Sequence, residues 1–256
     1  MTQVATVFTQ AQFDEFARLS GDDNPIHIDP EFSAKTRFGR TVAHGMFLLS
    51  VLQAEVARLH GGAVWIAEQE FIFRGPTFTG DPLLFDLEPR NDGTIGQVIT
   101  DSSGTIVTDG TTRLGVPDGA TPPQPRLIPS PDYKSLRVGM SASRTRLFTP
   151  DDVADYLRLV GDPNPLYTGL LPELPPLLLG GMVSWVLGVD LPGRGTNWLK
   201  QRDRFHQVVT VPAEVTTTVT ITRLRPDKGL VNLANSCVVN GQAVASGESL
   251  VLAVDV

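Results

Sequence analysis

The chain contains the segment Val7-Phe-Thr-Gln-Ala-Gln-Phe-Asp-Glu-Phe-Ala-Arg-Leu-Ser-Gly-Asp-Asp-Asn-Pro-Ile-His27, and the same pattern returns as Leu147-Phe-Thr-Pro-Asp-Asp-Val-Ala-Asp-Tyr-Leu-Arg-Leu-Val-Gly-Asp-Pro-Asn-Pro-Leu-Tyr167. Alignment of Asp22 with Asp162 sets the two copies about 140 residues apart. An internal repeat of this length indicates two copies of one structural unit. The repeat therefore determines the architecture that we expect.

Later landmarks repeat in the same order as this segment. Gly45-Met46 returns as Gly181-Met182, and Phe73 returns as Phe205. Between the copies, residues 116–131 contain six prolines, which cannot continue a helix or a central strand. The sequence thus predicts three regions, which are an N-terminal unit (1–120), a proline-rich linker running across the outside (121–131) and a C-terminal unit (132–256).

Each unit is expected to contain a short helix, a buried helix and then strands. The short helix is capped by Thr9 or Thr149 and ends at Gly21 or Gly161. The buried helix is apolar on most faces, and alternating β-branched runs follow it. The buried helices are expected at 43–60 and 177–188, and the strands at 63–73, 82–88, 97–100, 105–116, 197–206, 214–223, 230–239 and 243–254.

An apolar helix followed by antiparallel strands can bury its apolar surface when the sheet wraps round the helix. Two such units side by side would pair their sheets and bury edges that one unit leaves open. We therefore predict an α+β double hotdog, in which two antiparallel sheets each wrap a central helix and join as a pseudo-dimer. The joined sheet should be one long surface with both central helices on one side. A monomer of this kind and a homodimer are both compatible with the sequence.

Composition excludes several classes of function. The 256 residues are 41% hydrophobic and 19% charged, as in ordinary globular proteins, and the formal net charge of −7 argues against nucleic acid as a partner. The apolar runs are too short to cross a bilayer and no secretory signal is evident, so we expect a cytoplasmic protein without membrane association. The single cysteine, Cys237, excludes an internal disulfide and reads as a core residue. The four histidines lack metal-ligand spacing, so neither metal nor cofactor is expected.

The residues that carry chemistry gather in the first copy. Asp22 and His27 flank Asn24-Pro25, a turn-forming pair that can direct a carboxylate and an imidazole into one space, where both can touch one water. Gly45 begins the buried helix, where unpaired N–H groups and the helix dipole favour negative charge. These three residues are the candidate acid/base pair and the candidate oxyanion donor.

The segments Gly21-Asp-Asp-Asn-Pro-Ile-His27 and His44-Gly-Met46 resemble the motif of the MaoC-like (R)-specific enoyl-CoA hydratases and 3-hydroxyacyl-thioester dehydratases, also called hydratase 2. The resemblance covers nearly the whole chain as two units. It implies a hydro-lyase that reversibly adds water, with syn geometry, to a trans-2-enoyl thioester of coenzyme A or acyl carrier protein. It also implies that Asp22 and His27 are catalytic and that the Gly45 N–H binds the enolate oxygen.

Three neighbours are expected to support this site. Asn24 should hold the turn through its side chain, and His44 should make a structural hydrogen bond. Asp29 could either orient His27 or cap the next short helix. Three tryptophans are expected to pack in the core or between the halves, namely Trp65, Trp185 and Trp198.

The second copy keeps Asp162 but has Tyr167 in place of His27 and Gly180 in place of His44. A phenol with a pKa of about 10 is a poor base near neutral pH. We therefore expect one active site per chain and a degenerate second site. The C-terminal unit would be free to shape a tunnel for the acyl chain, with wall residues such as Leu178 and Val183.

Two other functions stay open at this point. A hotdog thioesterase would use Asp22 to activate water against the thioester carbonyl, although the ordered Asp, Asn-Pro and His argue against it. A non-catalytic acyl-thioester-binding subunit is plausible for the C-terminal half because of Tyr167, although the intact Asp22 and His27 argue against it for the chain. A basic group consists of Lys200, Arg202 and Arg204. It could bind either nucleotide phosphates or an acidic carrier protein.

Overall fold

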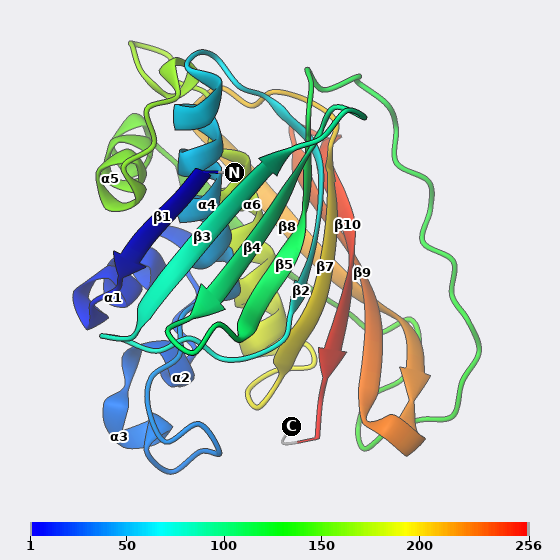
Figure 1. Ribbon diagram of the computed structural model, residues 1–256. Coiled ribbons are helices and arrows are strands. Elements are labelled where there is room, and N and C mark those ends of the chain that lie inside the picture. The colour runs from blue at the N-terminus through cyan, green and yellow to red at the C-terminus, as the bar shows by residue number, and fades with distance from the viewer. Residues whose placement is uncertain (1, 255–256) are drawn as a thin grey trace.

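A computed structural model describes residues 2–254. Within this range ten strands form one sheet, and the helices lie on one side of it with α4 and α6 next to each other (Figure 1). The strands are β1 (Thr2–Val7), β2 (Ile66–Phe73), β3 (Pro82–Pro89), β4 (Thr94–Asp101), β5 (Ile106–Leu114), β6 (Ser141–Phe148), β7 (Asn197–Phe205), β8 (Ala213–Arg225), β9 (Leu230–Val239) and β10 (Gln242–Leu252). The helices are α1 (Gln10–Ser20), α2 (Pro25–Ile28), α3 (Pro30–Ser33), α4 (Gly45–His60), α5 (Pro150–Val160) and α6 (Pro176–Trp185), with the short helices η1 (Pro165–Tyr167), η2 (Val186–Asp190) and η3 (Pro226–Lys228).

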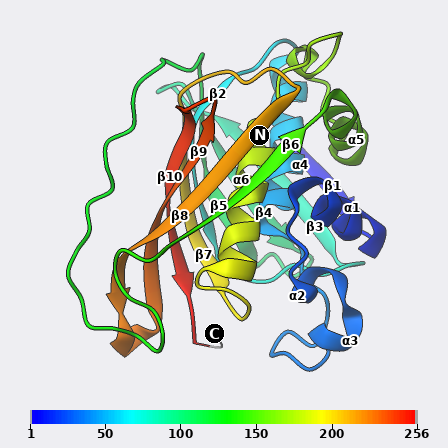
Figure 2. The same ribbon diagram turned by 180° about the vertical axis from the view of Figure 1, so that it is seen from behind.

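The sheet is continuous across the repeat. Its strand order is β1-β3-β4-β5-β2-β7-β10-β9-β8-β6, and all pairs are antiparallel. The elements up to β5, here called the N-terminal half, meet those from β6 onward, the C-terminal half, where β2 pairs with β7. Seen from behind, α6 crosses the sheet beside α4 (Figure 2). The prediction of a double hotdog with one joined sheet and both central helices on one side is confirmed.

The end of α1 determines where the first motif lies. Thr9 begins the helix with a capping box, in which its N–H donates to Gln12 Oε1 over 2.9 Å. Gly21 ends it with φ of 85°, a left-handed conformation that favours glycine. A Cβ at Gly21 would also lie 2.6 Å from the ring of Trp185 on α6. The chain therefore turns into the first motif directly against the C-terminal half.

Two strands at the sheet edges were not predicted. β1 and β6 pair on one side only, with β3 and β8 respectively. Most of β6 is exposed, so it lacks the alternation of buried and exposed residues that indicates a strand. Residues 115–140 contain neither helix nor strand, and the Ile128 N–H donates to the carbonyl of Thr222 over 2.8 Å. Among the described helices, none has the length and apolar character needed to cross a membrane.

A buried polar group lies at the junction of the halves. Gln69 on β2 is paired with Asp203 on β7, and its Nε2 donates to Asp203 Oδ2 over 2.8 Å. Gln201 Nε2 donates to the other carboxylate oxygen, Oδ1. Burial raises the pKa of Asp203 to about 6, and the two glutamines oppose this rise. The junction therefore contains a carboxyl group whose ionisation opposes folding.

Candidate active site

Asp22 is held by both halves of the molecule. It is 1% exposed, and its Oδ1 accepts a hydrogen bond from the Asn24 N–H over 3.3 Å. Its Oδ2 accepts from the hydroxyl of Ser184 on α6 over 2.5 Å. Burial raises the pKa of Asp22, whereas the charge of His27 and the Ser184 hydrogen bond lower it. Ser184 thus stabilises the carboxylate from the half that lacks the complete motif.

His27 presents one ring nitrogen to the cavity. Its Nδ1 lies 2.7 Å from the carbonyl oxygen of Val42. Because a carbonyl oxygen can only accept a hydrogen bond, Nδ1 carries the proton. The Val42 N–H in turn donates to the carbonyl of Ile26 over 3.0 Å, which ties the two segments together. Burial lowers the pKa of His27, and the charge of Asp22 opposes this effect. The neutral ring therefore carries its free lone pair on Nε2, which is the form of a base.

His44 packs against His27, with ring centroids 3.8 Å apart and planes at 28°. Its Nε2 donates to the backbone carbonyl of Asp22 over 2.9 Å. Burial lowers the pKa of His44 well below its usual value. The ring is therefore neutral and holds the backbone of Asp22 in place.

Ligand atoms of Asp22, His27 and His44 lie within 4.8 Å of one another, a spacing that a metal ion could span. Imidazole lone pairs lie in the ring plane, and the two rings are stacked. Their free nitrogens therefore do not converge on one point. The other nitrogen of each ring already has a hydrogen-bond partner, since His27 Nδ1 pairs with the carbonyl of Val42 and His44 Nε2 with that of Asp22. This arrangement suits proton transfer better than chelation.

Gly45 is the first residue of α4, directly after His44. Its N–H therefore has no carbonyl partner within the helix, and it lies at the positive end of the helix dipole. A Cβ at this position would lie 2.8 Å from ring atoms of Phe73. Glycine thus lets the aromatic ring and the start of the helix approach closely, and both line the same cavity as Asp22 and His27.

The two remaining residues of the motif act on the backbone. Asn24 caps α2 by accepting from the Ile26 N–H over 3.4 Å, and its Nδ2 donates to the carbonyl of Gly188 over 3.1 Å. Asp29 caps α3, because its Oδ1 accepts from the N–H groups of Glu31 and Phe32 at 2.9 and 3.0 Å. Of the two roles considered for Asp29, the structure therefore has the capping role.

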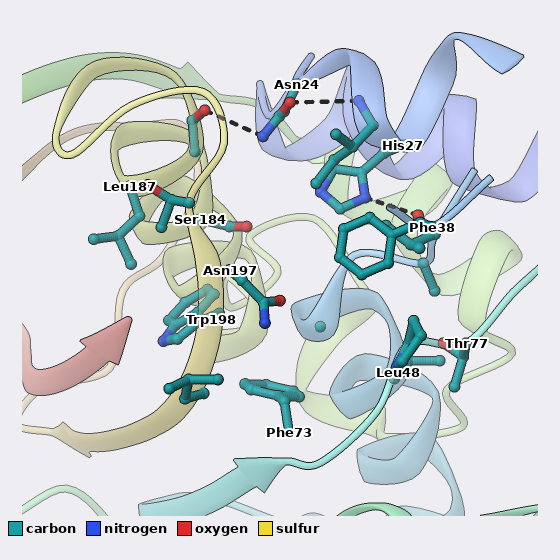
Figure 3. Close-up of a pocket in the computed structure, with 18 of the residues that line it drawn as sticks. Asn24, His27, Phe38, Leu48, Phe73, Thr77, Ser184, Leu187, Asn197 and Trp198 are labelled. Atoms are coloured by element: carbon teal, nitrogen blue, oxygen red, sulfur yellow. Dashed lines mark hydrogen bonds between the residues drawn. The ribbon is translucent and has the colours of Figure 1, made fainter. Parts of the chain in front are cut away.

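Both halves line the cavity, whose volume is about 320 Å³ (Figure 3). Leu187 and Trp198 come from the C-terminal half, and the Trp198 ring centroid lies 5.9 Å from that of Phe73. Trp198 thus packs between the halves, as expected, and it also lines the cavity, which was not expected. Leu178 and Val183 are buried away from this cavity, so they do not form its wall. The sequence did not reveal these wall residues, because only contact between the halves brings them there.

The second motif lies in a different setting. Tyr167 is buried, and burial raises the pKa of its phenol well above 10. Burial also raises the pKa of Asp162 to about 6. The small cavity beside Tyr167 measures about 30 Å³. Because α6 begins at Pro176, the N–H of Gly181 lies inside the helix, where it pairs with a carbonyl one turn earlier. The equivalent of the Gly45 N–H is therefore unavailable to a ligand.

The basic residues of β7 lie on the other side of the sheet from the cavity. Lys200, Arg202 and Arg204 alternate with the buried Gln201 and Asp203, so they point outward. Their partners are acidic. Lys200 Nζ lies 2.5 Å from a Glu70 oxygen, Arg202 Nε 3.9 Å from Glu70, and Arg204 contacts Glu68 and Asp118 at 3.5 and 2.9 Å. A role for this group in binding the carrier beside the cavity is therefore not supported.

The fold and the site together define a double hotdog protein with a buried aspartate–histidine pair beside a helix N-terminus. Residues 2–111 match the family model described as MaoC like domain. The (R)-specific enoyl-CoA hydratase of Rhodospirillum rubrum is 31% identical over 129 residues, which are 47% of this chain and 90% of that protein. The chain belongs to the MaoC-like dehydratase family.

Solved structures agree with this fold over nearly the whole chain. A MaoC-like dehydratase superposes with a TM-score of 0.77 at 17% identity, covering 98% of this chain and 97% of its own. A Mycobacterium tuberculosis protein described as having a double hotdog fold superposes with a TM-score of 0.75 at 12% identity, covering 97% of this chain and 93% of its own. Similarity at these identities concerns the fold alone.

Proposed function

We propose that the chain is an (R)-specific enoyl-thioester hydratase, equally a 3-hydroxyacyl-thioester dehydratase in the reverse direction. Its substrate would be a trans-2-enoyl thioester of coenzyme A or acyl carrier protein. The observation that carries the proposal is the shared cavity, in which the buried Asp22 carboxylate, the free Nε2 of His27 and the N–H of Gly45 all take part. The relative from Rhodospirillum rubrum, named for the same reaction, supports it.

These groups can divide the reaction among them. One water touching Asp22 and His27 Nε2 loses a proton to the pair as its oxygen bonds to C3, and the pair returns a proton to C2. Negative charge passes through the thioester oxygen, where the Gly45 N–H at the positive end of α4 stabilises it. Because both proton transfers involve one pair on one side of the substrate, the addition is expected to be syn.

One site per chain follows from the same reasoning. The C-terminal half has Tyr167 in place of His27, and the Gly181 N–H lies inside α6. We propose that this half, residues 132–256, contributes wall and support to the site of the N-terminal unit, residues 1–120. Ser184 is the clearest support, since its hydroxyl donates to Asp22.

The test follows the enoyl-thioester absorbance and the free thiol together, with trans-2-hexenoyl-CoA as the substrate. Hydration removes the absorbance without releasing thiol and gives the (R)-3-hydroxyacyl product. Asp22→Asn and His27→Ala should each lower turnover about 100-fold or more, with strongly non-additive effects because the pair acts on one water. Thiol release at the rate of absorbance loss would indicate a thioesterase, and near wild-type hydration by either variant would exclude the pair.

A further inference from the structure

Two asparagines line the cavity, and they differ in how they are bound. Asn24 has partners for both ends of its amide, the carbonyl of Gly188 and the N–H of Ile26. Asn197, the first residue of β7, is half-buried, and its side-chain amide makes no hydrogen bond within residues 2–254. Figure 3 shows it projecting into the cavity between Ser184 and Phe73. Its donors and its acceptor are therefore available to a ligand.

The surroundings of Asn197 are mostly apolar. Phe73, Leu187 and Trp198 line the same cavity, and the indole N–H of Trp198 is already committed to the carbonyl of Lys200 over 3.1 Å. A hydrocarbon chain that filled this space would remove water from the Asn197 amide and supply no replacement. An amide left unsatisfied in this way costs about 1–3 kcal/mol, whereas a ligand oxygen would avoid that cost.

The adjacent residue points to the same conclusion. Thr196 is 8% exposed and lines the cavity, and its hydroxyl has no hydrogen-bond partner among the described residues. Two successive residues of the C-terminal half thus have unused hydrogen-bonding groups at this wall, the Asn197 amide facing the cavity and the Thr196 hydroxyl buried within the wall. Protein interiors seldom leave such groups unpaired without a role.

We propose that Asn197 selects the acyl group, and that the preferred substrates are enoyl thioesters whose chain carries an oxygen function beyond the double bond. This inference rests on the proposed function, since it concerns the acyl group bound at the same site. In this arrangement the N-terminal half performs the proton transfers, and the C-terminal half determines which acyl groups are accepted.

The experiment compares trans-2-hexenoyl-CoA with analogues that carry a hydroxyl group at C4, C5 or C6. For the wild-type enzyme, kcat/KM should be about 10-fold higher for the best hydroxylated thioester than for the alkyl one. Asn197→Leu, which replaces the amide by a similar apolar volume, should lower this ratio to about one or less. Asn197→Gln, which keeps an amide, should retain part of it. Because every thioester is assayed with the same preparation, the ratio does not depend on the folded fraction.

The control is Asn91→Leu, the same substitution at an exposed turn, which should leave the ratio unchanged. The inference is overturned if the wild type prefers the alkyl thioester over all three analogues. It is also overturned if Asn197→Leu lowers kcat/KM equally for all substrates, since that result would indicate contact with the thioester group. If the wild type hydrates none of them, the proposed function fails and this inference with it. Hydration of all four at the same rate overturns the inference alone.

Discussion

Removal of the Ser184 hydroxyl should impair catalysis from the half that lacks the complete motif. The hydroxyl donates a buried hydrogen bond of 2.5 Å to Oδ2 of Asp22, and Ser184→Ala leaves that oxygen without this partner. A hydrogen bond to a charged group contributes about 1.5–3 kcal/mol. At about 1.4 kcal/mol for each factor of ten, kcat/KM should fall roughly 10- to 100-fold.

The pH profile distinguishes this effect from a general loss of structure. The Ser184 hydrogen bond lowers the pKa of Asp22, so its removal raises that pKa. If the carboxylate is the active form, the acidic limb of kcat/KM should move to higher pH in Ser184→Ala. The assay is enoyl-thioester hydration across the pH range, with thermal melting to confirm folding.

Ser50→Ala is the matched control. Ser50 is a buried serine on the other central helix, and its hydroxyl donates to the carbonyl of Met46 within α4 over 2.7 Å. It should lower stability without moving the acidic limb. The reasoning would be refuted if Ser184→Ala kept kcat/KM within about twofold and the same limb, or if Ser50→Ala produced the same shift.

Further predictions concern single positions. Gly45→Ala should lower kcat/KM about 10-fold or more, because the added Cβ would lie 2.8 Å from the ring of Phe73. The double variant with Phe73→Leu should recover part of the loss, and no recovery would contradict the steric reason. Tyr167→Phe should keep turnover within a few-fold of the wild type, so a loss as large as that of His27→Ala would argue for a second site. The raised pKa of Asp203, about 6, means that its ionisation reduces the free energy of unfolding as pH rises from about 4 to about 6, by at most about 3 kcal/mol. Urea denaturation at pH 4 and pH 8 should show a smaller decrease for Asp203→Asn than for the wild type, with the remainder due to other buried carboxyl groups such as Asp162, and an unchanged decrease would exclude Asp203 as a source.

Much of this protein could be predicted from local patterns. The order of helices and strands follows from apolar periodicity and from caps such as Thr9 and Gly21, which act within a few residues. The turn between Asp22 and His27 is local as well, since Asn24 caps α2 through its own neighbours. The edge strand β6 was missed because side chains on both of its faces are exposed. Its sequence therefore lacks the alternation of apolar and polar residues that indicates a strand.

The start of α6 shows a signal that was present but unused. Pro175 and Pro176 precede the apolar run, and proline is favoured at the first position of a helix. Read in this way, they indicate that the helix begins five residues before Gly181. The loss of the second oxyanion donor could then have been predicted along with the loss of the histidine.

The sequence by itself determined the repeat and the double hotdog and indicated the candidate acid/base pair, because the turn, cap and apolar residues of each unit act within a few residues and recur in the same order in the second unit. Only the tertiary structure decided what surrounds that pair. Ser184 meets Asp22, and Asn197 lines the cavity, because α6 and β7 pack against the N-terminal half. The ion pairs that Lys200 and Arg204 form with Glu70 and Glu68 likewise arise because β7 pairs with β2. These are contacts between residues distant in the chain, and no local pattern specifies them.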